Sequence, residues 1–479
     1  MSDSPGRSVV PEPTSTRAAV DPHRSVSRAD LIQWDHAHVW HPFTPQAAWL
    51  NDDPLIIERG EGVYLFDIEG NRYLDGVSSL WCNVHGHHHP RLDAAIRQQL
   101  DRMAHSTLLG VSHPGAIELS RQLAERAPEG LSRVFLSDSG ATAVEVALKM
   151  AFQYWRQKAN PEPQRTRFIA LQEAYHGDTL GDVSLGGLDA FHEMFRPLLF
   201  PTLRAPLPHC YHCPLSLKRP ECGMACLAAV EKLLVDHPGE VVAVVVEPLV
   251  QGAAGMIVHP EGYLKGLREL TKRHDTLLIA DEVAVGFGRT GRLFACEHEQ
   301  VSPDFLCLAK GITGGYLPLA ATLTTQEIYS AFVGDPHSDK TFFHGHTYGG
   351  NPLGAAVALA NLEVFDEEQT IERMPEKIEQ LAGWLEQFRR HPHVGEARQK
   401  GLMAGIELVQ DRETGQPFPS INKLGARICR HARKHGILIR PLGDVLVVMP
   451  PLSITATELD ELMRAMLLSL EEVTGCPLS

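Results

Sequence analysis

Two reactive side chains stand at the ends of apolar segments. Asp281 closes the segment LLIAD and Lys310 closes FLCLAK. A charged group at the end of a buried strand is costly unless it is paired or used chemically. A protonated pyridine nitrogen would pair with the carboxylate, and an aldehyde would form an imine with the amine. Taken singly, Asp281 has an ordinary explanation as a helix cap or ion-pair partner, and Lys310 as a side chain reaching solvent. Together, and joined by the segment GFGRTG, the two residues indicate this imine chemistry far more specifically than either does alone.

Four cysteines form a second group with chemical potential. Cys210, Cys213, Cys222 and Cys226 follow the spacing C-x2-C-x8-C-x3-C. Two short-spaced pairs of thiolates can converge on zinc or on an iron–sulfur centre. Reduced loop cysteines, or occasional disulfides, explain the same pattern. We predict no metal in the catalytic site, leave open whether these four cysteines bind one, and assign the cluster no catalytic role.

The elements that must position Asp281 and Lys310 alternate between strand and helix from about residue 95 to 340. This alternation predicts an α/β fold with a mostly parallel sheet and helices on both faces. Ligands bind such sheets at the carboxyl ends of the strands, where both residues fall. One helix is expected to start after Ser139, because apolar residues follow at helical spacing. The apolar runs expected as strands are RVFLSD, RFIALQ, VVAVVVEP, TLLIADEV and DFLCLAK.

The chain is expected to divide into four parts. Residues 1–30 read as a disordered tail rich in Ser, Pro and Arg. Residues 31–85, with short strands between about 55 and 75, are expected to pack with the small domain. Residues 86–350 form the large domain, and residues 351–479 form a smaller α+β domain.

Composition narrows the class of partner. The 479 residues are 43% hydrophobic and carry 59 acidic against 44 basic side chains, a formal charge of -15. This balance argues against nucleic acid or an anionic membrane as the main partner. No apolar stretch reaches the roughly 20 residues that span a bilayer, and no secretory signal is evident. We therefore predict a cytoplasmic protein that acts on small molecules.

The segment from residue 277 to 321, LLIADEVAVGFGRTGRLFACEHEQVSPDFLCLAKGITGGYLPLAA, closely resembles the signature of the class III, fold-type I aminotransferases. These enzymes use pyridoxal 5'-phosphate (PLP), and the resemblance covers about residues 35 to 475. It implies that Lys310 holds PLP as a Schiff base and then moves the proton during transfer. It also implies that Asp281 keeps the pyridine nitrogen protonated.

Further cofactor contacts follow from the same resemblance. The amides of Gly140 and Ala141, at the start of the helix after Ser139, are expected to bind the phosphate. The family often has serine where Ala141 stands, which removes one hydroxyl contact. Tyr175 and His176 resemble the motif whose aromatic ring covers the cofactor and lines the substrate pocket.

Two other segments match the family. Glu247 and Gln251, in VVEPLVQGAAG, match residues beside the cofactor's O3′. Gly345, His346 and Thr347 belong to a loop that resembles the one reaching the phosphate of a partner subunit. That implies a homodimer with composite active sites.

Within the family, the chain looks most like the branch that aminates 8-amino-7-oxononanoate to 7,8-diaminononanoate in biotin biosynthesis. The segments WHPFT, SSLW and IRPLG carry this likeness. Arg440 would pair with the distant carboxylate of the substrate, a task suited to a bidentate guanidinium. The expected substrate-binding residues are Phe43, Leu80, Trp81, Tyr175, Gly345 and Arg440.

The amino donor stays open between S-adenosylmethionine and lysine. Most members of this branch use S-adenosylmethionine, which calls for aromatic surface. Phe43, Leu80 and Val447 stand where aromatic or hydroxyl-bearing residues are usual, as in variants that use lysine.

Three rival functions are weighed. The first is another ω-aminotransferase, acting on a diamine, ornithine or 4-aminobutyrate. The second is a PLP aminomutase or racemase on the same fold. The third is a nucleotide-binding protein, which is disfavoured because no G-x-G-x-x-G follows the first strand of the α/β region.

Overall fold

A computed structural model describes residues 26–478, with the exception of residue 336. The chain divides into two compact units. One comprises the chain up to Ile57 together with Asp67–Glu69, and the other comprises Glu58–Phe66 and the chain from Gly70 onward. Most of the predicted tail, residues 1–30, lies outside the described residues, and helix α1 (Arg28–His38) already includes its last three positions.

The first unit contains α1 and the short helix α2 (Gln46–Trp49). Asp35 joins the two helices, because its carboxylate accepts hydrogen bonds from the indole of Trp49 at 2.6 Å and from His41 at 2.8 Å. His41, the second residue of the WHPFT segment, is therefore held by α1. Phe43 in the same segment adopts a φ of 50°.

The second unit is built on a seven-stranded sheet in the order β4-β12-β11-β10-β7-β5-β6. Strand β12 is antiparallel to both β11 and β4, while β11, β10, β7, β5 and β6 pair in parallel. The prediction of a mostly parallel sheet is confirmed. The strands are β4 (Leu131–Ser137), β5 (Arg167–Leu171), β6 (Leu203–Ala205), β7 (Val241–Val246), β10 (Leu277–Asp281), β11 (Phe305–Leu308) and β12 (Ala320–Thr325).

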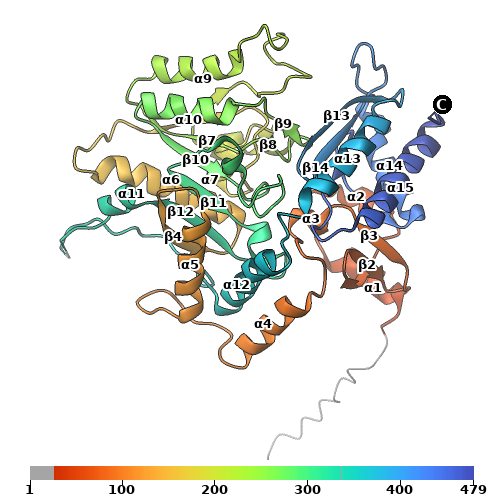
Figure 1. The fold of residues 1–479 in the computed structure, drawn as a ribbon, viewed down its shortest axis with the longest axis horizontal. Coiled ribbons are helices and arrows are strands. Elements are labelled where there is room, and N and C mark those ends of the chain that lie inside the picture. The colour runs from red at the N-terminus through yellow and green to blue at the C-terminus, as the bar shows by residue number, and fades with distance from the viewer. Residues whose placement is uncertain (1–25, 336, 479) are drawn as a thin grey trace, which may run out of the picture. The chain divides into compact units, whose positions relative to one another are not determined.

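Helices cover both faces of this sheet (Figure 1). Successive side chains of a strand point to opposite faces, so Leu278 and Ala280 join one apolar core while Leu277 and Ile279 join another. The first core includes side chains of α5 (Pro114–Arg126), α9 (Ala225–Asp236), α10 (Tyr263–Arg273) and α12 (Pro352–Glu367). The second includes side chains of α6 (Gly140–Gln157), α7 (Leu180–Leu185) and α11 (Gln326–Ala331).

The start of α6 is set by Ser139, as the sequence predicts. The Ser139 hydroxyl accepts a hydrogen bond from the Thr142 amide at 3.2 Å, and the Thr142 hydroxyl accepts one from the Ser139 amide at 3.0 Å. This reciprocal pair is a capping box, which satisfies two backbone donors. Phe152 is one of the apolar residues at helical spacing in α6, yet its side chain is exposed rather than buried. The guanidinium of Arg156 stacks on its ring.

The C-terminal part has an antiparallel sheet in the order β13-β14-β17-β16. Its strands are β13 (Val394–Lys400), β14 (Met403–Leu408), β16 (Pro441–Leu442) and β17 (Val445–Val448), and its helices are α13 (Met374–Phe388), α14 (Leu424–Ala432) and α15 (Ala456–Thr474). The early strands predicted near residues 55–75 are present as β1 (Ile57–Glu61), β2 (Tyr64–Asp67) and β3 (Arg72–Asp75). β3 pairs in parallel with β15 (Ile437–Leu438), which joins the early and late parts of the chain.

Shorter elements connect these layers. They are α3 (Ser78–Trp81), α4 (Pro90–Leu100), α8 (Asp189–His192), β8 (Val250–Gln251), β9 (Ile257–Val258) and the 3₁₀ turns Glu193–Leu198, Ala295–Glu299, Lys310–Thr313, Ser420–Asn422 and Arg433–His435. Among the described residues, no helix combines the length and apolar character needed to cross a bilayer.

Candidate active site

A cavity of about 660 Å³ opens at the carboxyl ends of the central strands. Asp281 is the last residue of β10, and it lies opposite Cys307 of the parallel neighbour β11. Lys310 follows β11 by two residues, and both side chains line the cavity. The sheet thus brings together the two residues that the sequence singled out, because adjacent parallel strands end at the same edge.

Asp281 is buried and held from two sides. Its Oδ2 lies 2.8 Å from Nδ1 of His176, and its Oδ1 accepts a hydrogen bond from the Val283 amide at 3.0 Å. Such contacts fix the orientation of the carboxylate before any ligand binds. The outer nitrogen of His176, Nε2, is buried without a hydrogen-bond partner among the described residues.

Lys310 stands in a strained backbone conformation, with a φ of 43°. Non-glycine residues seldom adopt this left-handed region, and they cluster there at functional sites. Burial lowers the pKa of the Lys310 amine, while Asp281 and Glu247 oppose that shift. The amine lies 5.7 Å from the centre of the Trp81 ring. A lowered pKa leaves more of the amine unprotonated and therefore nucleophilic.

The N-terminus of α6 forms another wall of the cavity. Gly140 and Ala141 line it, next to the capping residue Ser139. Because Ser139 and Thr142 cap each other, the first-turn amides of Gly140 and Ala141 remain for a ligand. An anion here gains both the amide hydrogen bonds and the helix dipole.

Tyr175 and Glu247 also line the cavity. The Tyr175 amide donates to Glu247 at 3.3 Å, and the Tyr175 hydroxyl donates to Asp178 at 2.8 Å. Glu247 also accepts from the Gly252 amide at 2.9 Å. Burial raises the pKa of Glu247 to about 7, and burial likewise raises the pKa of Tyr175.

Comparison with known proteins agrees with this geometry. The family model for aminotransferase class-III matches residues 46–470. The chain belongs to the class III aminotransferases. It is 58% identical over 436 residues to the adenosylmethionine-8-amino-7-oxononanoate aminotransferase of Nitratidesulfovibrio vulgaris, covering 91% of this chain and 80% of that relative.

Two solved structures share the fold of this aminotransferase. The adenosylmethionine-8-amino-7-oxononanoate aminotransferase from Methanocaldococcus jannaschii has a TM-score of 0.89 and 44% identity, covering 93% of this chain and 99% of that one. A PLP-bound amine transaminase from an uncultivated Pseudomonas species has a TM-score of 0.86 and 39% identity, covering 91% and 99%.

The aminotransferase is therefore PLP-dependent, and its cavity fits the cofactor. Lys310 offers an amine to an aldehyde, Asp281 offers a fixed carboxylate to a ring nitrogen, and the amides of Gly140 and Ala141 offer donors to a phosphate. These three requirements are met from three separate elements around one space. The rival reading as a nucleotide-binding protein has no support in this arrangement.

Several predicted site residues do not line this cavity. Leu80 is exposed beside Trp81, and Arg440 is exposed beyond β15. Gly345, His346 and Thr347 are also exposed, and His346 lies 3.1 Å from Asp138 of its own chain. The roles of these residues remain predictions.

Three other predicted positions lie in the core or in the first unit. Gln251 is fully buried and donates to the Gln172 carbonyl at 3.0 Å, away from the cavity wall. Val447 is buried in β17 and does not line this cavity, and its bearing on the amino donor remains a prediction. Phe43 belongs to the first unit and remains a prediction.

One acidic residue next to the cavity escaped the sequence reasoning. Asp182 lies in α7, fully buried, and both its carboxyl oxygens lack hydrogen-bond partners among the described residues. A Cβ at Gly177, in the cavity wall, would collide with this carboxyl group and with Ala141. Burial, and then the charge of Glu145, raise the pKa of Asp182 to about 10. In the sequence, the only indication of this residue is an acidic side chain inside the short apolar segment that follows residues 175–178.

Proposed function

We propose that this aminotransferase transfers an amino group to 8-amino-7-oxononanoate, giving 7,8-diaminononanoate in biotin biosynthesis. The convergence of Lys310, Asp281 and the α6 N-terminus on one cavity supports transamination. The substrate is supported by the names of relatives that share up to 58% identity over most of the chain. We take S-adenosylmethionine as the donor, because those names include it.

Each cavity residue has a separate role in the proposed transamination. Bound PLP supplies an aldehyde that takes up amino groups and a ring that withdraws electrons. Lys310 Nζ would hold that aldehyde, and it is the amine placed to take up and return a proton. Asp281, fixed by His176 and the Val283 amide, holds a proton on the ring nitrogen. Tyr175 and Trp81 line the cavity with aromatic surface, which would limit access of water to a bound cofactor.

The test incubates the purified full-length enzyme with PLP, 8-amino-7-oxononanoate and one amino donor at a time. Formation of 7,8-diaminononanoate is followed by mass spectrometry, with Lys310→Ala as the inactive control. Product from S-adenosylmethionine alone is expected, and product from lysine alone would correct the donor. Absence of product with both donors, together with rapid amination of pyruvate by a diamine, would instead establish a different ω-aminotransferase.

We further propose a homodimer with composite sites. Gly345, His346 and Thr347 are exposed and do not line the cavity of their own chain, which supports a role at the partner's site. Mixed dimers of Lys310→Ala and Thr347→Ala chains test this, because one of their two sites would be free of both changes. Activity above that of either variant alone is expected. Activity no higher than theirs would oppose shared sites.

We also propose that the enzyme works in the cytoplasm. All nine cysteines are unpaired, which fits a reducing compartment. Fractionation of the source cells, with detection of the native enzyme, tests the location.

A further inference from the structure

Four of the nine cysteines lie in residues 206–226, an irregular segment that follows β6 and runs into the first turn of α9. Two tight turns shape it. The Ser216 amide donates to the Cys213 carbonyl at 2.9 Å, and the Ala225 amide donates to the Cys222 carbonyl at 3.0 Å. Long connections without regular structure require side-chain contacts to stay in place. The structure has no disulfide here, so other contacts must hold this cysteine loop.

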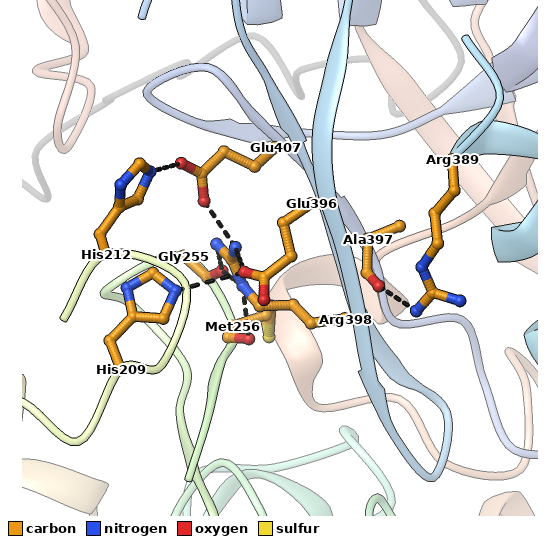
Figure 2. Close-up of polar contacts among 9 residues, drawn as sticks. All are labelled: His209, His212, Gly255, Met256, Arg389, Glu396, Ala397, Arg398 and Glu407. Carbon is orange, nitrogen blue, oxygen red and sulfur yellow. Dashed lines mark hydrogen bonds and ion pairs between the residues drawn. The ribbon is translucent and has the colours of Figure 1, made fainter. Parts of the chain in front are cut away.

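Histidines in the first half of the cysteine loop reach the C-terminal sheet (Figure 2). His209 lies 3.2 Å from Glu396 of β13, and His212 lies 2.6 Å from Glu407 of β14. Arg398 stands between the two glutamates, with its Nη1 2.5 Å from each. Considered without Arg398, the side chains of His209, Glu396 and Glu407 resemble a set of metal ligands. The guanidinium already pairs with both carboxylates, so this cluster is an ion-pair network that fastens the loop.

The four thiols have no such partner cluster and instead share a small cavity. Cys210, Cys213, Cys222 and Cys226 all line a space of about 20 Å³. A space of roughly 10–15 Å³ suffices for one water-sized sphere. No carboxylate lines the space, so hard cations such as calcium or magnesium have no suitable oxygen donors. Sulfur is the main donor available, which favours a soft or borderline cation.

The backbone brings the two cysteine pairs to this space from different directions. Cys210 and Cys213 flank one bend, while Cys226 lies in the first turn of α9 after Met224, whose φ is 56°. The Cys210 thiol interacts electrostatically with Cys213 and Cys222, and Cys226 interacts with Cys210 and Cys222. All four side chains are therefore within reach of one centre.

The thiols are not yet at metal-binding distances. No three of the four sulfur atoms lie within 4.8 Å of one another in the described part of the chain. A zinc–sulfur bond of about 2.3 Å implies sulfur–sulfur distances near 3.8 Å in a tetrahedron. Rotation of the thiol side chains into the cavity would close this difference, and metal–thiolate bonds provide the driving force for such local ordering.

We propose that Cys210, Cys213, Cys222 and Cys226 form a structural tetrathiolate site for zinc. Binding of one Zn²⁺ displaces four protons and forms four Zn–S bonds, leaving a net charge of minus two. Arg219, which hydrogen-bonds with Cys210, offsets part of that charge. The ion would hold the loop in the shape that presents His209 and His212 to the C-terminal sheet.

The first test measures metal content in the untagged, full-length enzyme purified with PLP and without chelators. One zinc per chain is expected by elemental analysis. Cys213→Ser and Cys226→Ser should each lose most of that zinc, whereas the matched control Cys476→Ser, a part-buried cysteine outside the cluster, should keep it. Zinc-free wild-type protein with four reactive thiols, or with disulfides detected by intact mass, would overturn the proposal, as would full zinc retention in Cys213→Ser.

A second measurement keeps the proposal testable if the variants do not fold. Wild-type enzyme is stripped with a chelator and titrated with Co²⁺, whose tetrahedral thiolate complexes absorb red light, away from the yellow cofactor. One equivalent of bound Co²⁺ with this absorption is expected, and Zn²⁺ should displace it. The stripped protein should also be cut faster by protease within residues 207–224. Absence of the red absorption, or an unchanged cleavage rate after stripping, would contradict the proposed site.

Discussion

The cavity at the ends of β10 and β11 differs from the network around Arg398 in how far its buried polar groups are hydrogen-bonded. Arg398 Nε donates hydrogen bonds to the Gly255 and Met256 carbonyls, and Nη2 donates to the Gly255 carbonyl. Its Nη1 pairs with two glutamates. At the cavity, His176 Nε2 and both oxygens of Asp182 lack partners among the described residues.

This difference separates a structural cluster from a reactive one. Buried polar groups are normally satisfied, and a satisfied network stabilises one conformation. Groups left without partners cost stability, and they persist where a ligand or a reaction uses them. The comparison predicts that changes at the cavity chiefly affect chemistry, while changes at Arg398 chiefly affect folding.

The largest expected effect is that of Lys310→Ala on activity. Loss of the amine that binds and shuttles protons should lower turnover by at least about 1000-fold. The purified variant should also lose the yellow chromophore that borohydride fixes to the protein. Lys377→Ala is a matched control, because Lys377 is another partly buried lysine, which donates to the Leu452 carbonyl. It should keep its activity and lose some stability; equal inactivation of both variants would break the comparison.

Arg398→Met should cost about 3–5 kcal/mol of unfolding free energy, because it strands the carboxylates of Glu396 and Glu407. Urea unfolding measures this loss, and adding Glu396→Gln and Glu407→Gln should restore part of it. Arg389→Met is the control (Figure 2), since Arg389, at the C-terminal end of α13, is more exposed and contacts the carbonyl of Ala397 in the same sheet. That control should lose no more than about 1 kcal/mol. Similar losses in both arginine variants would contradict the assignment.

Asp182→Asn should stabilise the protein, and the gain should depend on pH. The pKa of Asp182 in the folded protein, about 10, lies well above the ordinary value for an aspartate, about 3.9. The folded state therefore binds the extra proton between about pH 4 and 10, so its stability falls as pH rises through that window. The variant removes this fall, with a gain of at most about 4 kcal/mol at pH 7. Unfolding curves of variant and wild type at about pH 5, 7 and 9 test whether the stability gain grows with pH. A gain independent of pH would mean that Asp182 is ionised in the folded state.

The smallest effect is expected for His212→Ala. The His212 side chain is 48% exposed, and its partner Glu407 keeps its contact with Arg398. Exposed pairs contribute about 0–1 kcal/mol, and salt weakens them. Urea unfolding at low and high salt measures the difference from wild type. His209→Ala, at a side chain only 6% exposed, should cost more. The reverse order would show that exposure does not decide the value of these contacts.

Much of the site could be predicted from short stretches of sequence. Asp281 and Lys310 each end an apolar run, and parallel strands place such ends together. The Ser139 cap depends on residues within one turn, so it too was readable in advance. Asp182 was missed because its cost arises from burial behind Gly177 and from the charge of Glu145, which are close to it only in space.

The sequence by itself determined the α/β alternation, the start of α6 and the strand-end pair of Asp281 and Lys310, because these depend on local periodicity and on neighbours along the chain. Only the tertiary structure decided that Arg398 lies between Glu396 and Glu407 and that His209 and His212 reach those carboxylates. Pairing energies of buried charges depend on distance and on exclusion of water, and neither is encoded in a residue's immediate neighbours.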